Sequence, residues 1–210
     1  MHTTTGVFVC FEGGEGLGKS TQARLLAARL EQQGYDVLLT FEPGGTPAGQ
    51  QIRRIVLDPD TGELAHRAEA LLFAADKAEH VETVVLPALQ RGAVVITDRY
   101  VDTTLAYQGH ARDLAVADVE WINRWATGDL RPHLTVVLDG DPAVGLGRFE
   151  GRDRIEAETP EFFERARKAF LELAVADPDH YVVLEADRPI DALAEAVASR
   201  VEPLLHRARR

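Results

Sequence analysis

The stretch from residue 6 to residue 22 constrains the fold of this chain more than any other. Residues 7–11 form a short apolar run that is typical of a buried strand. The glycine-rich segment 13–20, with the sequence GGEGLGKS, follows that run directly. After it, apolar residues recur with the spacing of one helix face, at Ala23, Leu26, Ala27 and Leu30. The order of strand, loop and helix predicts a phosphate-binding loop of the G-x-x-x-x-G-K-S type.

The chemistry of such a loop follows from its residues. Glycines allow successive backbone N–H groups to point inward around phosphate oxygens, and the start of the helix adds its positive end. Lys19 is expected to reach the β and γ phosphates, and the hydroxyl of Ser20 to bind Mg²⁺. The alternative is a chance lysine in a glycine-rich turn, which leaves the flanking strand and helix unexplained. The segment therefore indicates binding of a nucleoside triphosphate.

Composition narrows the class of protein. The chain has 210 residues, which favours a single domain over residues 1–210. Its formal net charge of −11 argues against nucleic acid as the main partner. No apolar run approaches the ~18 residues of a membrane helix, and no signal peptide is recognised, so we expect no membrane partner. The single cysteine, Cys10, fits a protein of the cytoplasm, and the scattered histidines predict no zinc site.

The rest of the chain alternates between strand and helix patterns. Strands are expected at residues 36–41, 93–97, 134–138 and 181–184. Helices are expected over 48–57, 63–90 with a kink at Pro87, 115–126, 142–148 and 190–206, and Thr159 and Pro160 predict the N-cap and first position of another. Five short apolar strands separated by helices predict an α/β protein with a doubly wound, three-layer fold: a five-stranded parallel sheet with helices on both faces. Ligands bind such a sheet at the carboxyl ends of its strands.

Two further segments carry charged groups toward that edge. Asp98 and Arg99 directly follow a buried strand, where a carboxylate can hold Mg²⁺ and an arginine can hold a phosphate; a surface salt bridge is the alternative. Arg148, Arg152 and Arg154 lie close together between two helices, either as a solvated loop or as a basic lid over residues 145–158. No Asn-Lys-x-Asp or Asp-x-x-Gly motif of a GTPase switch is present, and no strand ends in Asp-Glu as in motor ATPases. With these classes excluded, the remaining class is a small kinase that phosphorylates a small molecule.

These motifs together resemble the thymidylate kinase family, in its bacterial type with a basic lid. The matching segments are the phosphate-binding loop with the preceding Phe11 and Glu12, and residues 42–46, 72–77, 98–100, 106–109 and 153–156. The resemblance implies a P-loop NTPase fold and transfer of a phosphoryl group from Mg·ATP to dTMP, giving dTDP. It also implies a cytoplasmic homodimer.

The resemblance further implies roles for individual residues. The catalytic group would comprise Glu12, Lys19, Arg99, Arg152 and Arg154. ATP would be held by Gly13, Gly14, Glu15, Gly16, Leu17, Gly18, Lys19, Ser20, Thr21 and Arg148. The residues implied for dTMP are Glu42, Arg53, Phe73, Lys77, Arg99, Thr104, Tyr107 and Gln108, with Phe73 stacked on thymine and Tyr107 crowding the 2′ position of the sugar. Ser20 and Asp98 would hold Mg²⁺.

The chain departs from the family pattern at two places, residue 77 and the lid. Lys77 stands where an arginine is expected, and lysine lacks the planar fork that binds a phosphate through two bonds. The expected lid is a few residues shorter. Gly16 places the chain with those relatives that have a small residue in the loop and use lid arginines for catalysis, and Arg152 is the favoured one here.

Two other functions remain open from the sequence. One is a kinase for another nucleoside monophosphate or for a deoxynucleoside. The other is a nucleotide-binding regulatory module without turnover, against which the complete set of Lys19, Ser20, Asp98, Arg99 and lid arginines argues.

Overall fold

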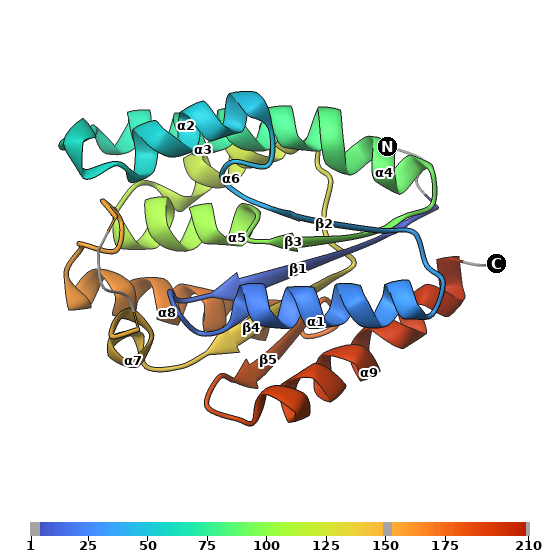
Figure 1. Ribbon diagram of the computed structural model, residues 1–210. Coiled ribbons are helices and arrows are strands. Elements are labelled where there is room, and N and C mark those ends of the chain that lie inside the picture. Colours follow the sequence, from blue (N-terminus) through green and yellow to red (C-terminus); the bar gives the residue numbers. More distant parts are fainter. Residues whose placement is uncertain (1–4, 149–152, 209–210) are drawn as a thin grey trace.

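The computed structural model describes residues 5–148 and 153–208. These residues contain a five-stranded, fully parallel sheet with the strand order β2-β3-β1-β4-β5 (Figure 1). The strands are β1 (Val7–Gly13), β2 (Val37–Phe41), β3 (Val94–Asp98), β4 (Leu134–Asp139) and β5 (Tyr181–Glu185). The predicted fold class is confirmed, and each strand begins or ends within two residues of its expected position. The strand that carries the phosphate-binding loop occupies the centre of the sheet.

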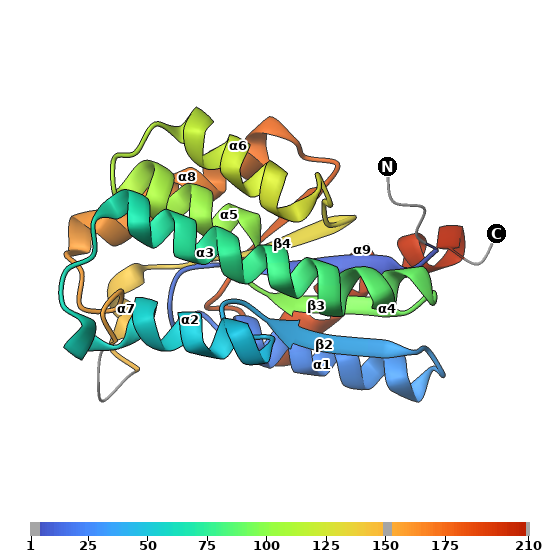
Figure 2. The ribbon, with the colours of Figure 1, turned by 90° about the horizontal axis from the view of Figure 1, so that it is seen from above.

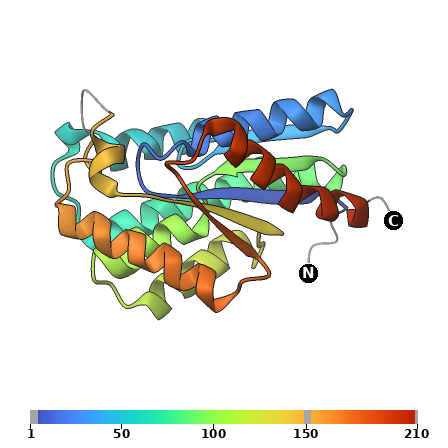
Figure 3. The same ribbon diagram turned by 90° about the horizontal axis from the view of Figure 1, so that it is seen from below.

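Helices cover both faces of this sheet (Figures 1 and 3). The α-helices are α1 (Lys19–Gln32), α2 (Pro47–Leu57), α3 (His66–His80), α4 (Leu86–Gln90), α5 (Val101–Thr104), α6 (Val116–Thr127), α7 (Pro142–Leu146), α8 (Pro160–Ala176) and α9 (Ile190–Ala208). The short turns between them are η1 (Pro59–Thr61), η2 (Val81–Val85) and η3 (Leu105–Ala111). The figure from above shows α2, α3 and α6 as neighbours in an outer layer, and α3 packs against both of the others (Figure 2).

The central strand divides the core between the two faces. Val7, Val9 and Phe11 point toward α1 and α9, whereas Phe8 and Cys10 point toward η2 and α4. A third cluster joins η3, β4 and α8, with the ring of Tyr107 among the phenylalanines of α8. Because a strand buried on both faces needs a continuous apolar run, residues 7–11 gave a clear strand signal.

The region after residue 62 differs from its prediction. The long helix begins at His66 rather than residue 63, and it widens into the π-helical turn η2 before Pro87. Proline has no N–H to donate and clashes with the preceding turn, and the wider π-helical turn lies directly before it. A second π-helical segment, η3, extends α5 and was not predicted as a helix. The apolar residues of η3 do not recur at the spacing of a helix face, so the sequence contains no helix signal there.

The N-terminus of α8 forms as expected. Thr159 is the N-cap and its hydroxyl accepts a hydrogen bond from the N–H of Phe162 at 3.3 Å, while Pro160 occupies the first turn. The helix then carries Phe162, Phe163 and Phe170 into the core beside Tyr107. This packing fixes the side chain of Tyr107, which borders the cavity described below.

Gly13 and Gly34 offer a matched test of backbone constraint. Both have a positive φ, but a Cβ on Gly13 would lie 2.3 Å from the carbonyl oxygen of Leu138 in β4, whereas one on Gly34 would meet no atom within 4 Å. We expect Gly34→Ala to lower the free energy of unfolding by about 1–2 kcal/mol, the strain of a left-handed residue. Gly13→Ala should cost more than about 3 kcal/mol, because strain and a backbone clash add. Urea unfolding of both variants checks this, and equal losses would contradict it.

Candidate active site

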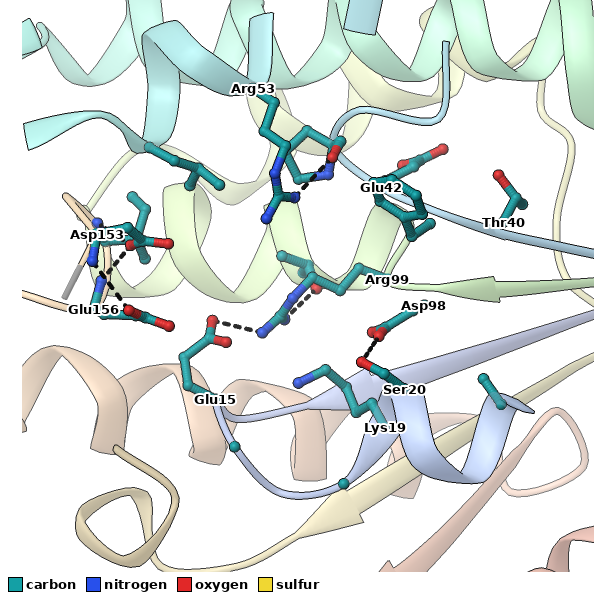
Figure 4. A pocket seen from close by; sticks show the side chains of 18 of the residues that line it. Glu15, Lys19, Ser20, Thr40, Glu42, Arg53, Asp98, Arg99, Asp153 and Glu156 are labelled. Carbon is teal, nitrogen blue, oxygen red and sulfur yellow. Dashed lines mark hydrogen bonds and ion pairs between the residues drawn. The ribbon is translucent and has the colours of Figure 1, made fainter. Parts of the chain in front are cut away.

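A cavity of about 660 Å³ opens at the carboxyl ends of the central strands (Figure 4). The phosphate-binding loop borders one side, and β2 with the loop after it borders the other. Its lining includes Glu15, Gly16, Gly18, Lys19, Ser20, Thr21, Thr40, Phe41, Glu42, Pro43, Arg53, Phe73, Asp98, Arg99, Thr103, Tyr107, Arg148, Asp153, Ile155 and Glu156. Most of the residues that the sequence analysis selected therefore meet in one place. The size and the polar lining suit a nucleotide-sized ligand.

The loop has the backbone that phosphate binding requires. Gly13, Gly16 and Gly18 all have positive φ, with values of 124°, 64° and 97°. The Nζ atom of Lys19 donates to the carbonyl oxygen of Gly14 at 2.6 Å, so the side chain lies along the loop (Figure 4). Burial and the charge of Arg99 lower the pKa of Lys19, although nearby carboxylates oppose this. An incoming phosphate would restore the lost solvation of this ammonium group.

The loop also touches α7 through two glycines. A Cβ on Gly16 would lie 2.2 Å from the carbonyl oxygen of Gly145, and one on Gly145 would lie 2.0 Å from the carbonyl oxygen of Glu15. Gly16 is thus small because the backbone of α7 occupies the space that its side chain would need.

Ser20 and Asp98 fit the expected metal site. The Ser20 hydroxyl at the start of α1 donates to Oδ2 of Asp98 at the end of β3, and both residues line the cavity beside the loop. A hydroxyl and a carboxylate are hard oxygen ligands of the kind that Mg²⁺ takes while keeping several waters or phosphate oxygens. Ser20 and Asp98 could therefore hold Mg²⁺, and this role stays a prediction.

Arg99 extends across the floor of the cavity. Its backbone has φ 72°, which is unusual for a residue with a side chain and costs of order 1–3 kcal/mol. The guanidinium donates to Glu15 at 2.5 Å, to the Thr103 hydroxyl at 3.0 Å and to the Gly13 carbonyl at 3.3 Å. Burial alone would raise the pKa of Glu15, but the charges of Arg99 and Lys19 outweigh it and lower that pKa. An ionised Glu15 thus holds Arg99 in the site.

Glu12 lies beneath this arrangement and is not among the cavity-lining residues. Its fully buried carboxylate accepts from the N–H of Tyr100 at 2.8 Å, and from the N–H and hydroxyl of Thr103 at 3.2 Å and 2.5 Å. Burial raises the pKa of Glu12 despite the opposing charge of Arg99. Its predicted catalytic role stays a prediction, and its contacts favour a positioning role for the loop that presents Arg99.

The side of the cavity away from the loop carries the predicted acceptor residues. Phe73, Glu42, Arg53 and Tyr107 all line it. Arg53 donates to the carbonyl oxygen of Pro43 at 2.9 Å, and its guanidinium lies 5.9 Å from the Phe41 ring centre (Figure 4). The hydroxyl of Tyr107 donates to Glu15 at 3.2 Å. An aromatic wall, two carboxylates and an arginine thus face the same space.

Lys77 and Thr104 lie behind that wall rather than on it. Lys77 is buried; its Nζ donates to the Thr104 hydroxyl at 2.7 Å and lies 3.5 Å from a Glu42 oxygen. The sequence analysis did not find His80, which lies 2.7 Å from Glu42 through Nδ1 and 2.7 Å from the Thr40 hydroxyl through Nε2. The sequence did hold a signal for His80, because it lies three residues after Lys77 and so on the same face of the helix. Help from Lys77 to an acceptor phosphate stays a prediction, and its contacts indicate that it positions Glu42.

Gln108 and Arg154 also lie behind the wall, and both contact a residue that the sequence analysis missed. Glu69 on α3 is fully buried, and it accepts from Gln108 Nε2 at 2.9 Å and from Arg112 Nε at 3.0 Å. Arg154 donates to the same carboxylate and, through Nε, to the carbonyl oxygen of Val56 at 2.9 Å. Glu69 precedes Phe73 by one helical turn, which is the signal that could have drawn attention to it.

The structure describes the two ends of the expected lid, residues 145–148 and 153–158. Arg148 is exposed, lines the cavity and donates to the Gly16 carbonyl at 2.5 Å. Asp153, Ile155 and Glu156 line the cavity from the other end of the segment. Arg152 lies outside the described residues, so its predicted role as the catalytic arginine is untested. Arg154 points toward α2 and α3 and is not a lining residue in this conformation.

Fold and cavity together define a P-loop NTPase of the kind that transfers a phosphoryl group between nucleotides. The sequence profile of the thymidylate kinase family matches residues 11–197. A thymidylate kinase of Cutibacterium acnes is 51% identical over 202 residues, which cover 96% of this chain and 99% of that protein. One of Clavibacter sepedonicus is 50% identical over 205 residues, covering 96% and 97%.

A solved structure agrees with the sequence comparisons. The crystal structure of thymidylate kinase from Ehrlichia chaffeensis superimposes with a TM-score of 0.79 at 29% identity, covering 93% of this chain and 98% of that one. The chain belongs to the thymidylate kinase family. Among the described residues, no helix is long and apolar enough to cross a membrane.

The Glu15–Arg99 pair predicts a pH dependence of stability. Because the folded-state pKa of Glu15 is lowered, its contribution is fully present above the unfolded pKa of ~4.3 and is lost as the pH falls through the folded value. We expect Glu15→Gln to lower the free energy of unfolding by about 1–3 kcal/mol at pH 7, and by much less near pH 3. Thermal unfolding across this range measures it. Asp129→Asn, which breaks an exposed pair with Arg124, is the control and should change little. A loss that does not vary with pH would contradict the expectation.

Proposed function

We propose that the chain transfers the γ-phosphoryl group of Mg·ATP to dTMP, giving dTDP and ADP. One observation carries this proposal: a single cavity is lined both by Lys19 of the phosphate-binding loop and by Phe73 and Arg99. Family membership supports the acceptor, because the matching relatives are thymidylate kinases.

The reaction requires alignment more than proton transfer. An oxygen of the dTMP phosphate forms a bond to the γ phosphorus while the bond from that phosphorus to the β–γ bridging oxygen breaks, and ADP leaves. The attacking oxygen is already ionised near pH 7, so no general base is needed. Lys19 stabilises negative charge on the donor side and Arg99 holds the acceptor phosphate, which brings two polyanions into line. Ser20 and Asp98 would hold Mg²⁺, which would supply further positive charge to the phosphates when bound.

The acceptor pocket suits a pyrimidine deoxynucleotide. The ring of Phe73 provides an apolar surface for stacking, and Tyr107, whose hydroxyl donates to Glu15 of the loop, lines the same cavity. Gln108 has a buried amide oxygen without a hydrogen-bond partner among the described residues. Gln108 is not a lining residue of the cavity, so its predicted contact with the edge of the base stays a prediction.

Further parts of the proposal concern the whole chain. We treat residues 1–210 as one domain and residues 145–158 as a lid, because Arg148 and Glu156 border the cavity from the two ends of that segment. We also propose that Arg152 supplies positive charge that stabilises the transferring phosphoryl group in the transition state. Cys10 is a buried free thiol, which agrees with a cytoplasmic location.

A homodimer is also proposed, through the outer layer of helices. Leu71 on α3 is 56% exposed, and Trp121 and Trp125 on α6 are 67% and 76% exposed. Figure 2 shows α3 and α6 as neighbours, and the two helices pack against each other. The exposed Leu71, Trp121 and Trp125, with the two indoles one turn apart, therefore belong to adjacent helices. Exposed apolar groups of this size often mark an interface between subunits.

Charged substitutions at the exposed tryptophans of α6 test the proposed dimer. Wild-type protein should sediment at about twice the chain mass of 23.1 kDa. The double variant Trp121→Glu, Trp125→Glu should sediment as a monomer, because carboxylates cannot be buried in an apolar interface without a large cost. Val175→Glu on α8, at an equally exposed apolar position, is the control and should stay dimeric. A monomeric wild type, or a double variant that remains dimeric, would rule this interface out.

The function is tested with a panel of nucleoside monophosphates and Mg·ATP, with ADP release as the measurement. We expect dTMP to exceed dUMP by roughly 10–200-fold in kcat/KM, since one methyl group separates them, and dCMP and purine nucleotides to be poorer. Lys19→Ala should lower kcat at least ~10²-fold while leaving the unfolding transition in place. A preference for dCMP or a purine nucleotide would show that dTMP is not the acceptor. Near-normal turnover of Lys19→Ala would show that Lys19 does not stabilise the transferring phosphoryl group.

A further inference from the structure

Phe41 is a large apolar side chain that the core does not enclose. It ends the edge strand β2, it is 46% exposed, and it lines the cavity. Apolar groups stabilise a fold in proportion to the surface they remove from water, so a ring left half-exposed adds less to stability than a buried one. The arginine beside the ring indicates another role for it.

Arg53 of α2 lies against this ring although its side chain is exposed. Its guanidinium carbon is 5.9 Å from the centre of the Phe41 ring, within the range in which an aromatic ring attracts a cation. Its Nη1 atom donates to the carbonyl oxygen of Pro43 at 2.9 Å. The ring and the carbonyl thus restrain a long side chain that would otherwise sample many rotamers in water.

The loop after β2 leaves space for this contact. Gly44 has φ 114°, and a Cβ there would lie 3.0 Å from Cδ of Arg53 and 3.3 Å from Cε2 of Phe41. The N–H of Gly44 donates to the buried carboxylate of Asp76 at 3.0 Å, which fixes the loop. A residue without a side chain at position 44 therefore lets the arginine approach the ring on a fixed backbone.

The guanidinium of Arg53 points into the cavity opposite that of Arg99 (Figure 4). A guanidinium has five N–H donors, and the bond to Pro43 uses one of them, so donors remain for an anion. Two arginines that face each other across a cavity suit a phosphate group, because each can donate two parallel hydrogen bonds to its oxygens.

We propose that Phe41 is a positioning residue that holds Arg53 in place for the phosphate of the acceptor nucleotide. An arginine that is already ordered loses less rotamer freedom when the ligand binds, so the ring raises affinity through the arginine. The effect is specific for the phosphate, because the base and sugar gain nothing from Arg53. The proposal rests on the proposed function, because it needs a nucleoside monophosphate in the cavity.

The test compares dTMP with thymidine, which has the same base and sugar but no phosphate. Calorimetry without ATP gives the Kd of each. Phe41→Leu keeps an apolar side chain but removes the aromatic face, so the Kd for dTMP should rise by about two- to fivefold. The Kd for thymidine should stay the same, which general damage to the pocket would not allow. Phe41→Trp, with the ring that attracts cations most strongly, should bind dTMP at least as tightly as wild type.

Arg53→Met supplies the second arm of the test. Alone it should raise the Kd for dTMP, and in its presence Phe41→Leu should have no further effect, because the ring then has no cation to hold. Val183→Ala is the control, because Val183 is 41% exposed on the other edge strand, β5. It should leave both Kd values unchanged. If thymidine binds too weakly to measure, the comparison with and without Arg53 decides alone.

An unchanged Kd for dTMP in Phe41→Leu, or an equal rise for thymidine, would overturn the inference. The same rise in the presence and absence of Arg53 would overturn it too. In each case wild-type protein could still phosphorylate dTMP, and the proposed function would stand. If wild-type protein neither bound nor phosphorylated dTMP, the proposed function itself would fail, which is a separate result.

Discussion

The buried carboxylate of Glu12 holds the two sides of the reaction centre in register. It stands at the end of the central strand, just before the phosphate-binding loop. It accepts hydrogen bonds from the N–H groups of Tyr100, which follows β3, and of Thr103 in α5. Arg99 lies between β3 and these anchored groups in a strained backbone conformation. Such strain persists only where the surrounding structure determines it fully. The position of the Arg99 guanidinium therefore depends on a residue that does not border the cavity.

The site also shows how an acidic protein can gather positive charge for two polyanionic nucleotides. The net charge of −11 belongs to the whole chain, but Lys19 and Arg99 meet at the cavity floor. Glu15 and Asp98 lie beside them and offset their mutual repulsion, so the two cations can be held close together without ligand. Phosphates can then take over part of this role from the carboxylates. Local arrangement, rather than total charge, determines what the cavity attracts.

The sequence predicted those parts of the structure that depend on neighbours in the chain. The five strands, the loop and the N-cap at Thr159 are local patterns, and all of them form. Contacts between distant segments were beyond such patterns. Lys77 was assigned to a phosphate because the family resemblance implies that role, but its partners Glu42 and Thr104 come from the loop after β2 and from α5. The cluster around Glu69 likewise joins residues 39 to 85 positions apart, and no local signal indicates that they meet.

The contact between Gly16 and Gly145 restricts how this enzyme could change its catalytic design over evolutionary time. A basic side chain at position 16 would give the loop a catalytic cation of its own by a single substitution. In this chain the route is blocked, because the backbone of α7 fills the space and each glycine presses on the other segment. Displacement of α7 would have to come first, or both changes would have to arise together. The two catalytic designs are thus separated by a correlated pair of changes rather than by one mutation.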